Sequence, residues 1–263
     1  MTEFEELQSN LRRLGLKRMA EVFSKEADRA ATLNTSYTAY LTRLTAEELI
    51  AANERSVNHR YKQARFPGVR TLESFNYGFQ PSVNEALIRE LGGLSFLEQA
   101  ENIILLGPPG VGKTHLAIGL GIKACGVRKK VRFVTALELM DELAAAAASR
   151  RLASALEHLG RFDLLIIDEL GYLVMDKSRA NLFFQLVNRC YERVSIIITS
   201  NRSFDQWGEA IGDETIATAI LDRLVHHGHI IAIQGESYRV RDRRLKGVDK
   251  STKGSENEPK TAG

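Results

Sequence analysis

The sequence has few cysteines and no long apolar segment. It contains 2 cysteines among 263 residues, Cys125 and Cys190. Each lies in an apolar helical stretch, so we predict small core residues and no disulfide framework. The sequence has neither a run of 18 apolar residues nor an apolar signal segment near its start, which are the patterns of membrane spans and secretory signals. We therefore expect a cytoplasmic protein with no membrane partner.

The sequence also lacks a strong net charge, since 36 Lys and Arg residues face 33 Asp and Glu residues, a formal charge of +3. The basic residues are nevertheless clustered, in residues 55–70, which contain no acid, in residues 128–130, and in residues 239–246. Such clusters suit phosphate backbones, and a solvated surface is the alternative. The members of the first and last clusters are Arg55, Arg60, Lys62, Arg65 and Arg70, and Arg239, Arg241, Arg243, Arg244 and Lys246.

Hydrophobic periodicity and breaker residues divide the chain into four predicted segments. A small all-helical N-terminal domain, with helix breaks at Gly15 and at 33–36, is followed by a connector that begins at Pro67. An α/β domain comes next, and a polar tail without aromatic residues is predicted to be disordered. The four segments are 1–66, 67–101, 102–246 and 247–263. The apolar faces expected on the first and third helices are Phe4, Leu7, Leu11 and Leu14, and Tyr37, Leu41, Leu44 and Leu49.

Within the third segment, short apolar runs alternate with helical patterns. This alternation predicts an α/β fold whose parallel sheet is covered by helices on both faces. The expected strands are 103–106, 131–135, 163–167, 194–199 and 229–233, and the expected helices are 113–125, 136–148, 178–191 and those within 205–226, after a short helix at 82–91.

A phosphate-binding loop follows the first expected strand. Residues 107–114 read Gly-Pro-Pro-Gly-Val-Gly-Lys-Thr and match the pattern G-x-x-x-x-G-K-[ST] between a strand and a helix. The glycines allow close backbone approach, so that successive N–H groups surround phosphate oxygens. Lys113 would reach the outer phosphates and the Thr114 hydroxyl would bind Mg²⁺. The predicted loop residues are Gly107, Pro108, Pro109, Gly110, Val111, Gly112, Lys113 and Thr114, and the predicted ligand is a nucleoside triphosphate with Mg²⁺.

Two adjacent acids end the apolar strand 163–167. Asp168 would hold Mg²⁺ and Glu169 would activate a water molecule as general base. A solvated acidic turn is the alternative interpretation. The adjacent pair favours a hydrolase over a kinase of small molecules, because it provides a group that activates water.

Two further residues are candidates for the site. Asn201 follows the strand Ile196–Ser200 and would contact the γ-phosphate or the water, unless it serves only as a helix cap. Arg223 lies on an apolar helix and needs a partner. That partner is either an acid of the same subunit, such as Asp222, or the phosphate held by a neighbouring subunit. We reject a metal site at His226, His227 and His229, because no cysteine completes a tetrahedral set.

The connector contains three aromatic residues, Phe75, Tyr77 and Phe79. They either anchor the connector on the α/β domain or cover the adenine base, since the connector directly precedes the phosphate loop.

Several strings together resemble the AAA+ NTPases, and more closely the IstB-type ATPases of insertion-sequence transposition, which are relatives of the DnaC-type helicase loaders. The likeness extends over about residues 1–246. The strings are Asn102–Ala117, Asp163–Tyr172, Thr199–Asn201, Ala219–His227 and Gly235–Arg239.

The resemblance implies an AAA+ P-loop core that binds ATP and Mg²⁺ at the interfaces of a homo-oligomer. It also implies assembly on duplex DNA, a part in the choice of target and stimulation of a partner transposase. We further predict that ATP hydrolysis, through Glu169 and Arg223, controls disassembly. By position, Asn201 becomes the sensor and Arg223 the arginine finger that acts in trans. Few residues follow the last expected strand, so a helical lid with a second sensor is not expected, and Arg239 and Arg241 are the only candidates for that role.

Two other functions compete with this interpretation. A DnaC-like helicase loader would have the same core motifs and would act on single-stranded DNA and a replicative helicase. A nucleoside or metabolite kinase would use the same phosphate loop, but Asp168, Glu169, Asn201 and Arg223 argue against it.

Overall fold

The computed structural model describes residues 2–172 and 174–241. The chain divides into two compact units, one that ends at His59 and one that begins at Arg60. The segment boundaries predicted at 66 and 101 stay predictions, and the predicted disordered tail, 247–263, lies outside the described residues.

The first unit is helical, as predicted. It contains α1 (Glu3–Arg13), α2 (Lys17–Thr32) and the first part of α3 (Tyr37–Ala64). Gly15 adopts a φ of 78° at the first break, a value that favours glycine. The buried apolar residues form one small cluster, Leu11, Met19, Ala20, Phe23 and Leu44.

The apolar faces predicted for α1 and α3 are mostly wrong. Among the eight residues predicted, only Leu11 and Leu44 are buried, and Tyr37 is 90% exposed. The buried cluster takes one residue from α1, three from α2 and one from α3, so the helices of this unit pack through few positions and leave most of the predicted faces exposed.

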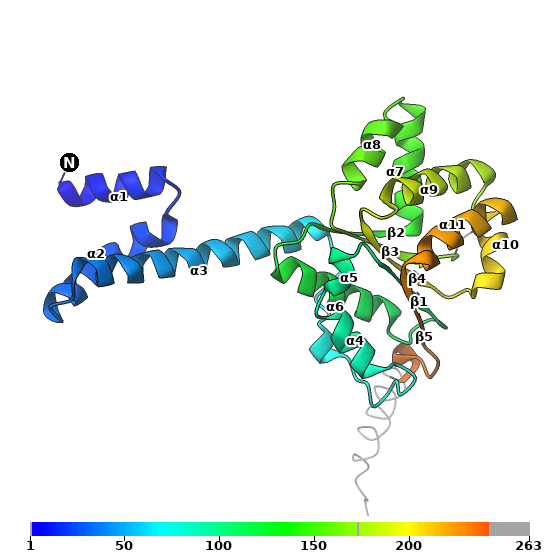
Figure 1. Cartoon of the computed structure of the whole chain (residues 1–263), viewed down its shortest axis with the longest axis horizontal. Helices are drawn as coiled ribbons and strands as arrows, with labels where there is room; N and C mark the ends of the chain where they lie inside the picture. Colours follow the sequence, from blue (N-terminus) through cyan, green and yellow to red (C-terminus); the bar gives the residue numbers. More distant parts are fainter. Residues whose placement is uncertain (1, 173, 242–263) are drawn as a thin grey trace, which may run out of the picture. The chain divides into compact units, whose positions relative to one another are not determined.

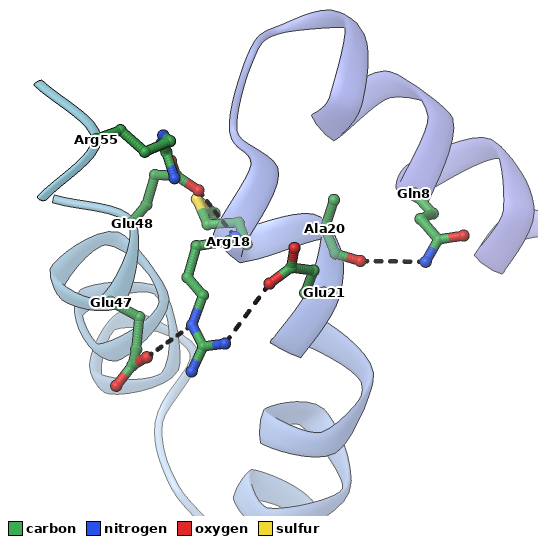
Figure 2. Close-up of polar contacts among 8 residues, drawn as sticks. Gln8, Arg18, Ala20, Glu21, Glu47, Glu48 and Arg55 are labelled. Carbon is green, nitrogen blue, oxygen red and sulfur yellow. Dashed lines mark hydrogen bonds and ion pairs between the residues drawn. The ribbon is translucent and has the colours of Figure 1, made fainter. Parts of the chain in front are cut away.

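Helix α2 receives its N-terminal cap from another helix. Its own N-cap residue, Leu16, has no side-chain acceptor to offer. The Met19 backbone N–H instead donates to Glu48 Oε2 of α3 at 2.9 Å. Glu48 is buried and forms an ion pair with Arg55, as Figure 2 shows. Burial alone would raise the pKa of Glu48, but the Met19 N–H and Arg55 outweigh it, so the pKa lies below its usual range.

We expect Glu48→Ala to loosen α2. The Met19 N–H would lose a charged acceptor, a loss worth about 1.5–3 kcal/mol. The amides of residues 19–23 should then exchange about 10- to 150-fold faster in hydrogen exchange followed by mass spectrometry. The pH dependence follows from the lowered pKa. The stabilisation is present above the unfolded pKa of about 4.3 and is lost as pH falls through the lower folded value.

The matched control is Glu47→Ala. Glu47 is the neighbouring residue and forms an ion pair with Arg18, as Figure 2 shows. Both partners of this pair are exposed. Exposed pairs stabilise little because solvent screens them, so exchange in α2 should change by less than about fivefold. Equal effects of the two substitutions would contradict the capping role of Glu48.

The second unit contains a five-stranded parallel sheet, which confirms the predicted fold class. The strand order is β2-β3-β4-β1-β5. The strands are β1 (Asn102–Leu106), β2 (Val131–Thr135), β3 (Leu164–Leu170), β4 (Ser195–Ser200) and β5 (Gly228–Ala232). The strand that carries the phosphate loop, β1, therefore lies between β4 and β5.

Alternate residues of each strand face opposite sides of the sheet and fill two separate cores. Ile103 and Leu105 pack on the side of α6 (Lys113–Gly126), whereas Ile104 packs on the side of α7 (Ala136–Ala148). Figure 1 shows the two helical layers. The first layer also contains α4 (Glu85–Leu91) and α5 (Ser95–Glu98), and the second contains α8 (Leu152–Leu159), α9 (Lys177–Cys190), α10 (Trp207–Ile211) and α11 (Glu214–His226).

Local sequence signals explain where several of these helices begin. Thr135 and Glu138 form a capping box on α7, and the carboxylates of Asp176 and Asp213 accept N–H groups at the starts of α9 and α11.

None of the helices within the described ranges has both the length and the apolar character needed to cross a bilayer.

Candidate functional site

The phosphate loop connects β1 to α6 and is tightly enclosed. Gly110 and Gly112 have φ values of 83° and 104°. A Cβ atom on Gly110 would lie 2.1 Å from Ser237 Oγ, and one on Gly112 would lie 2.6 Å from the Phe75 ring. Both positions therefore require glycine for conformation and for space.

The Lys113 ammonium group points into the loop. Its Nζ donates to the carbonyl oxygens of Gly107 and Pro108 at 2.6 and 2.8 Å. Burial lowers the pKa of Lys113, although the Asp168 carboxylate acts in the opposite direction. Arg239 also lowers this pKa, so a second cation lies near the buried ammonium group.

Two hydroxyl groups converge on Asp168. Thr114 Oγ1 donates to the buried Asp168 carboxylate at 2.9 Å from Oδ1, and Thr199 Oγ1 donates to the same oxygen at 2.5 Å. Thr199 Oγ1 also accepts the Glu169 backbone N–H at 3.0 Å. Thr199 thus joins the ends of β3 and β4 and orients both acids.

Glu169 lies within β3 in an unusual backbone conformation. Its φ is 62°, in the left-handed region, and the pairing of β3 with β4 shifts register between Ile167 and Leu170. Such irregularities redirect side chains, often next to active sites. Asp168 is consequently buried, whereas the neighbouring Glu169 is exposed and lines a cavity beside the phosphate loop, the nucleotide cavity.

The structure brings together the predicted residues Lys113, Thr114, Asp168 and Glu169 around one cavity of about 530 Å³. This volume lies within the usual range of small-ligand sites. The hydroxyl and carboxylate oxygens of Thr114 and Asp168 are the donor types that Mg²⁺ prefers, so these residues fit the ion. The other lining residues include Pro67, Arg70, Ser74, Asn76, His115, Tyr238 and Arg239.

Asn201 is exposed and does not line this cavity within the described residues. The polar residue of β4 that contacts the acids is Thr199. Sequence reasoning missed Thr199, although Thr199 immediately precedes Ser200 and Asn201 in the string that suggested a sensor. The assignment of Asn201 stays a prediction.

Arg223 has no acidic partner among the residues that the structure describes. Its Nε donates to Asn188 Oδ1 at 3.3 Å and its Nη1 to the Ala219 carbonyl at 2.9 Å. The guanidinium carbon lies 5.0 Å from the centre of the Phe184 ring. The alternative of an ion pair with Asp222 is therefore not supported. The contacts of Arg223 that the structure describes are with neutral groups, and its role as a finger stays a prediction.

The connector is fixed against the phosphate loop. His115 Nε2 lies 2.8 Å from the Thr71 carbonyl, which only accepts, so this nitrogen carries the proton. Burial lowers the pKa of His115, which keeps the ring neutral. Phe75 packs on Gly112 and on the His115 ring. These contacts support the anchoring role for Phe75, and a role of Tyr77 or Phe79 over the adenine stays a prediction.

The last described segment also reaches the site. The Tyr238 N–H donates to the Gly110 carbonyl at 3.0 Å, and its hydroxyl donates to the Asn76 carbonyl at 2.7 Å. Arg241 lies over the ring of Phe79, with its guanidinium carbon 4.4 Å from the ring centre. Sequence reasoning gave this segment no structural role, because its contacts join residues far apart in the chain.

Cysteine and histidine residues give two further outcomes. Cys125 and Cys190 are free and buried, as predicted, and burial raises their pKa values to about 11 and about 12. The structure places Glu192 beside His226 and His227, with one ligand atom of each residue within 4.8 Å of the others. These three side chains are exposed, and the rejection of a metal site there stays a prediction.

The comparisons with known proteins agree with this geometry. The model of the IstB-like ATP binding protein family matches residues 9–246. The ATP-binding protein of insertion sequence IS21 from Pseudomonas aeruginosa is 45% identical over 243 residues, 92% of each chain. That of insertion sequence IS5376 from Geobacillus stearothermophilus is 44% identical over 241 residues, 92% of this chain and 96% of the relative.

Solved structures with low sequence identity share the fold. Replication initiator DnaA bound to AMPPCP and single-stranded DNA has a TM-score of 0.55 at 19% identity, over 70% of this chain and 57% of that one. The DnaC helicase loader has a TM-score of 0.50 at 24% identity, over 66% of this chain and 98% of the loader. Together with the family match over most of its length, these findings show that the chain belongs to the IstB-like ATP-binding proteins, with an AAA+ fold.

Proposed function

We propose that this protein is an ATP-dependent helper of transposition. It would oligomerise on duplex target DNA, recruit or stimulate a partner transposase, and use ATP hydrolysis to control disassembly. The names of the relatives support the link to insertion sequences. The observation that carries the hydrolytic part is the convergence of Thr114, Asp168 and Glu169 beside the phosphate loop.

Each residue would have a distinct task in hydrolysis. Mg²⁺, when bound, neutralises charge on the phosphate oxygens. Thr114 and Asp168 would hold that ion, and Lys113 would hold the outer phosphates. Glu169 would take a proton from the attacking water, a task that suits an exposed carboxylate in the cavity.

The state of Arg223 supports assembly through the nucleotide. Within the described ranges Arg223 neither lines the cavity of its own subunit nor contacts an acid. An arginine finger that reaches the nucleotide of a neighbouring subunit would explain why the partly buried Arg223 contacts neutral groups, and no acid, among the described residues. The contact is heterologous, so successive subunits would form a ring or a helix.

The direct test is to measure the mass of the full chain by light scattering, with ATP, ADP or no nucleotide and with or without duplex DNA. We expect a large assembly with ATP and duplex DNA and a small species otherwise. Purified transposase should co-elute only with the large assembly. The Lys113→Ala variant is the control and should stay small throughout.

Two outcomes would contradict the proposal. One mass under all conditions would exclude nucleotide-driven assembly. Assembly on single-stranded DNA and not on duplex DNA would favour the helicase-loader alternative.

A further inference from the structure

A groove rich in basic residues lies at the edge of the sheet opposite the nucleotide cavity. The partners Val131 and Leu164 begin β2 and β3, whereas Thr135 and Asp168 lie at the other end of the same strand pair. Val131 lines this groove, and Asp168 lines the nucleotide cavity. The basic groove has a volume of about 440 Å³, and its polar lining residues include Arg60, Gln63, Arg65, Lys130, Arg132 and Arg161.

The groove gathers cations from three separate parts of the chain. The end of α3 contributes Arg60 and Gln63, β2 and the residue before it contribute Arg132 and Lys130, and the turn after α8 contributes Arg161. Five of the lining residues carry a permanent positive charge and none is acidic. The two ion pairs nearby, Arg132 with Glu142 and Arg161 with Glu157, use acids that do not line the groove.

Two guanidinium groups in the groove have unsatisfied donors. The Nε atoms of Arg60 and Arg132 are buried, and neither has a hydrogen-bond acceptor among the described residues. A buried donor without an acceptor is destabilising. Both arginines line the groove, and arginine is well suited to phosphate because its donors form a planar fork.

We propose that the basic groove binds the phosphodiester backbone of duplex DNA. This inference rests on the proposed function and assigns it a surface. Arg, Lys and Gln side chains are common donors to DNA phosphates. An acidic protein segment is less consistent with the lining, because protein interfaces have apolar centres that are depleted of charge, and only Val131 and Phe162 are apolar here.

The groove differs from the basic clusters visible in the sequence. Arg55 lies outside the groove because it pairs with Glu48, and Arg70 lines the nucleotide cavity. Lys62 is exposed and does not line the groove. Arg132 and Arg161, which no cluster suggested, belong to it because the sheet brings them there.

The first experiment measures the salt dependence of duplex DNA binding by fluorescence anisotropy, with a non-hydrolysable ATP analogue. The variant is Arg65→Ala/Lys130→Ala/Arg161→Ala, which removes exposed groove cations and keeps Arg60 and Arg132. Each lost phosphate contact should reduce the slope of log K against log salt by about 0.9, so the slope should fall by about 2–3. Affinity should fall at least ~10-fold at constant salt.

The control is Arg89→Ala/Arg151→Ala/Arg193→Ala, which removes three exposed cations outside the groove. For this control, the slope of log K against log salt should fall by less than it does for the groove variant. Both variants should bind the ATP analogue as the parent does, which excludes misfolding of the nucleotide domain. If the parent binds DNA and the groove variant keeps the parental slope of log K against log salt, the groove does not bind DNA, and the proposed function is unaffected. If the parent failed to bind duplex DNA, the proposed function and the groove would both be wrong.

The second experiment tests proximity by a covalent bond. A duplex carrying a pyridyl disulfide on its backbone is mixed with the Gln63→Cys variant. The thiolate attacks the disulfide, a protein–DNA disulfide forms and pyridine-2-thione leaves. The native Cys125 and Cys190 are buried with raised pKa values and should not compete.

We expect cross-linking at least ~10-fold faster for Gln63→Cys than for Gln99→Cys, since an exposed thiolate reacts according to its access to the disulfide. Gln99 is an exposed glutamine outside the groove. Equal rates would overturn the assignment of DNA to the groove. A groove variant that keeps DNA binding and loses only binding to transposase would show that the groove serves a protein partner.

Discussion

The Glu169→Gln variant is expected to hydrolyse ATP about 10²- to 10⁴-fold more slowly than the parent chain, the usual contribution of a general base. ATP binding should stay within a few-fold, because Glu169 is exposed and its backbone, not its side chain, makes the bond to Thr199. The amide keeps the size of the carboxylate and removes its basicity. Phosphate release and equilibrium binding of a fluorescent ATP analogue, measured on the same preparation, separate the two effects.

Two further variants show whether the loss of hydrolysis is specific to the Glu169 carboxylate. Asp168→Asn should weaken Mg²⁺-dependent binding as well as hydrolysis, because Asp168 is buried and accepts two hydroxyl groups. Glu90→Gln, an exposed acid away from the cavity, should behave as the parent does. Parental turnover by Glu169→Gln would show that another group activates the water.

The Arg223→Ala variant is expected to lower turnover about 10³-fold or more, as arginine fingers do, without loss of ATP binding. The Glu169→Gln variant is inactive for a different reason, since it cannot activate the water but still binds ATP. If Arg223 acts on the neighbouring subunit, a mixture of the Arg223→Ala and Glu169→Gln variants should recover activity. In a random equimolar mixture, about one interface in four joins an intact Glu169 to an intact Arg223 of the neighbouring subunit.

The mixing experiment has a clear negative outcome. If Arg223 acts within its own subunit, no subunit of the mixture has both intact groups, and the mixture stays inactive. The Arg89→Ala variant, which removes an exposed arginine, is the control and should keep parental activity alone and in mixtures.

The sequence predicted those parts of the site that are continuous in the chain. Residues 107–114 and the pair Asp168 and Glu169 follow apolar strands, and strand-to-loop junctions of this kind can be recognised locally. The strand positions in the sheet domain were predicted to within a few residues. Their order in the sheet was not, because it depends on contacts between distant segments.

Three features could not be predicted because they depend on pairing. Thr199 meets Asp168 only in the register of β4 with β3. Glu48 caps α2 from a position 29 residues away in the chain. The basic groove needs β2 to bring Arg132 next to the turn after α8. Each residue looks ordinary in its own local sequence, so local patterns carry no signal for it.

The position of β1 between β4 and β5 has a consequence for synthesis on the ribosome. The phosphate loop is made early, but the strands that flank its strand end at Ser200 and Ala232, and Tyr238 closes on Gly110 later still. Domains fold as units during vectorial synthesis, and contacts between distant segments form slowly. A nascent chain therefore acquires the complete pocket only after Tyr238 has left the exit tunnel, so we expect ATP binding to begin late in synthesis.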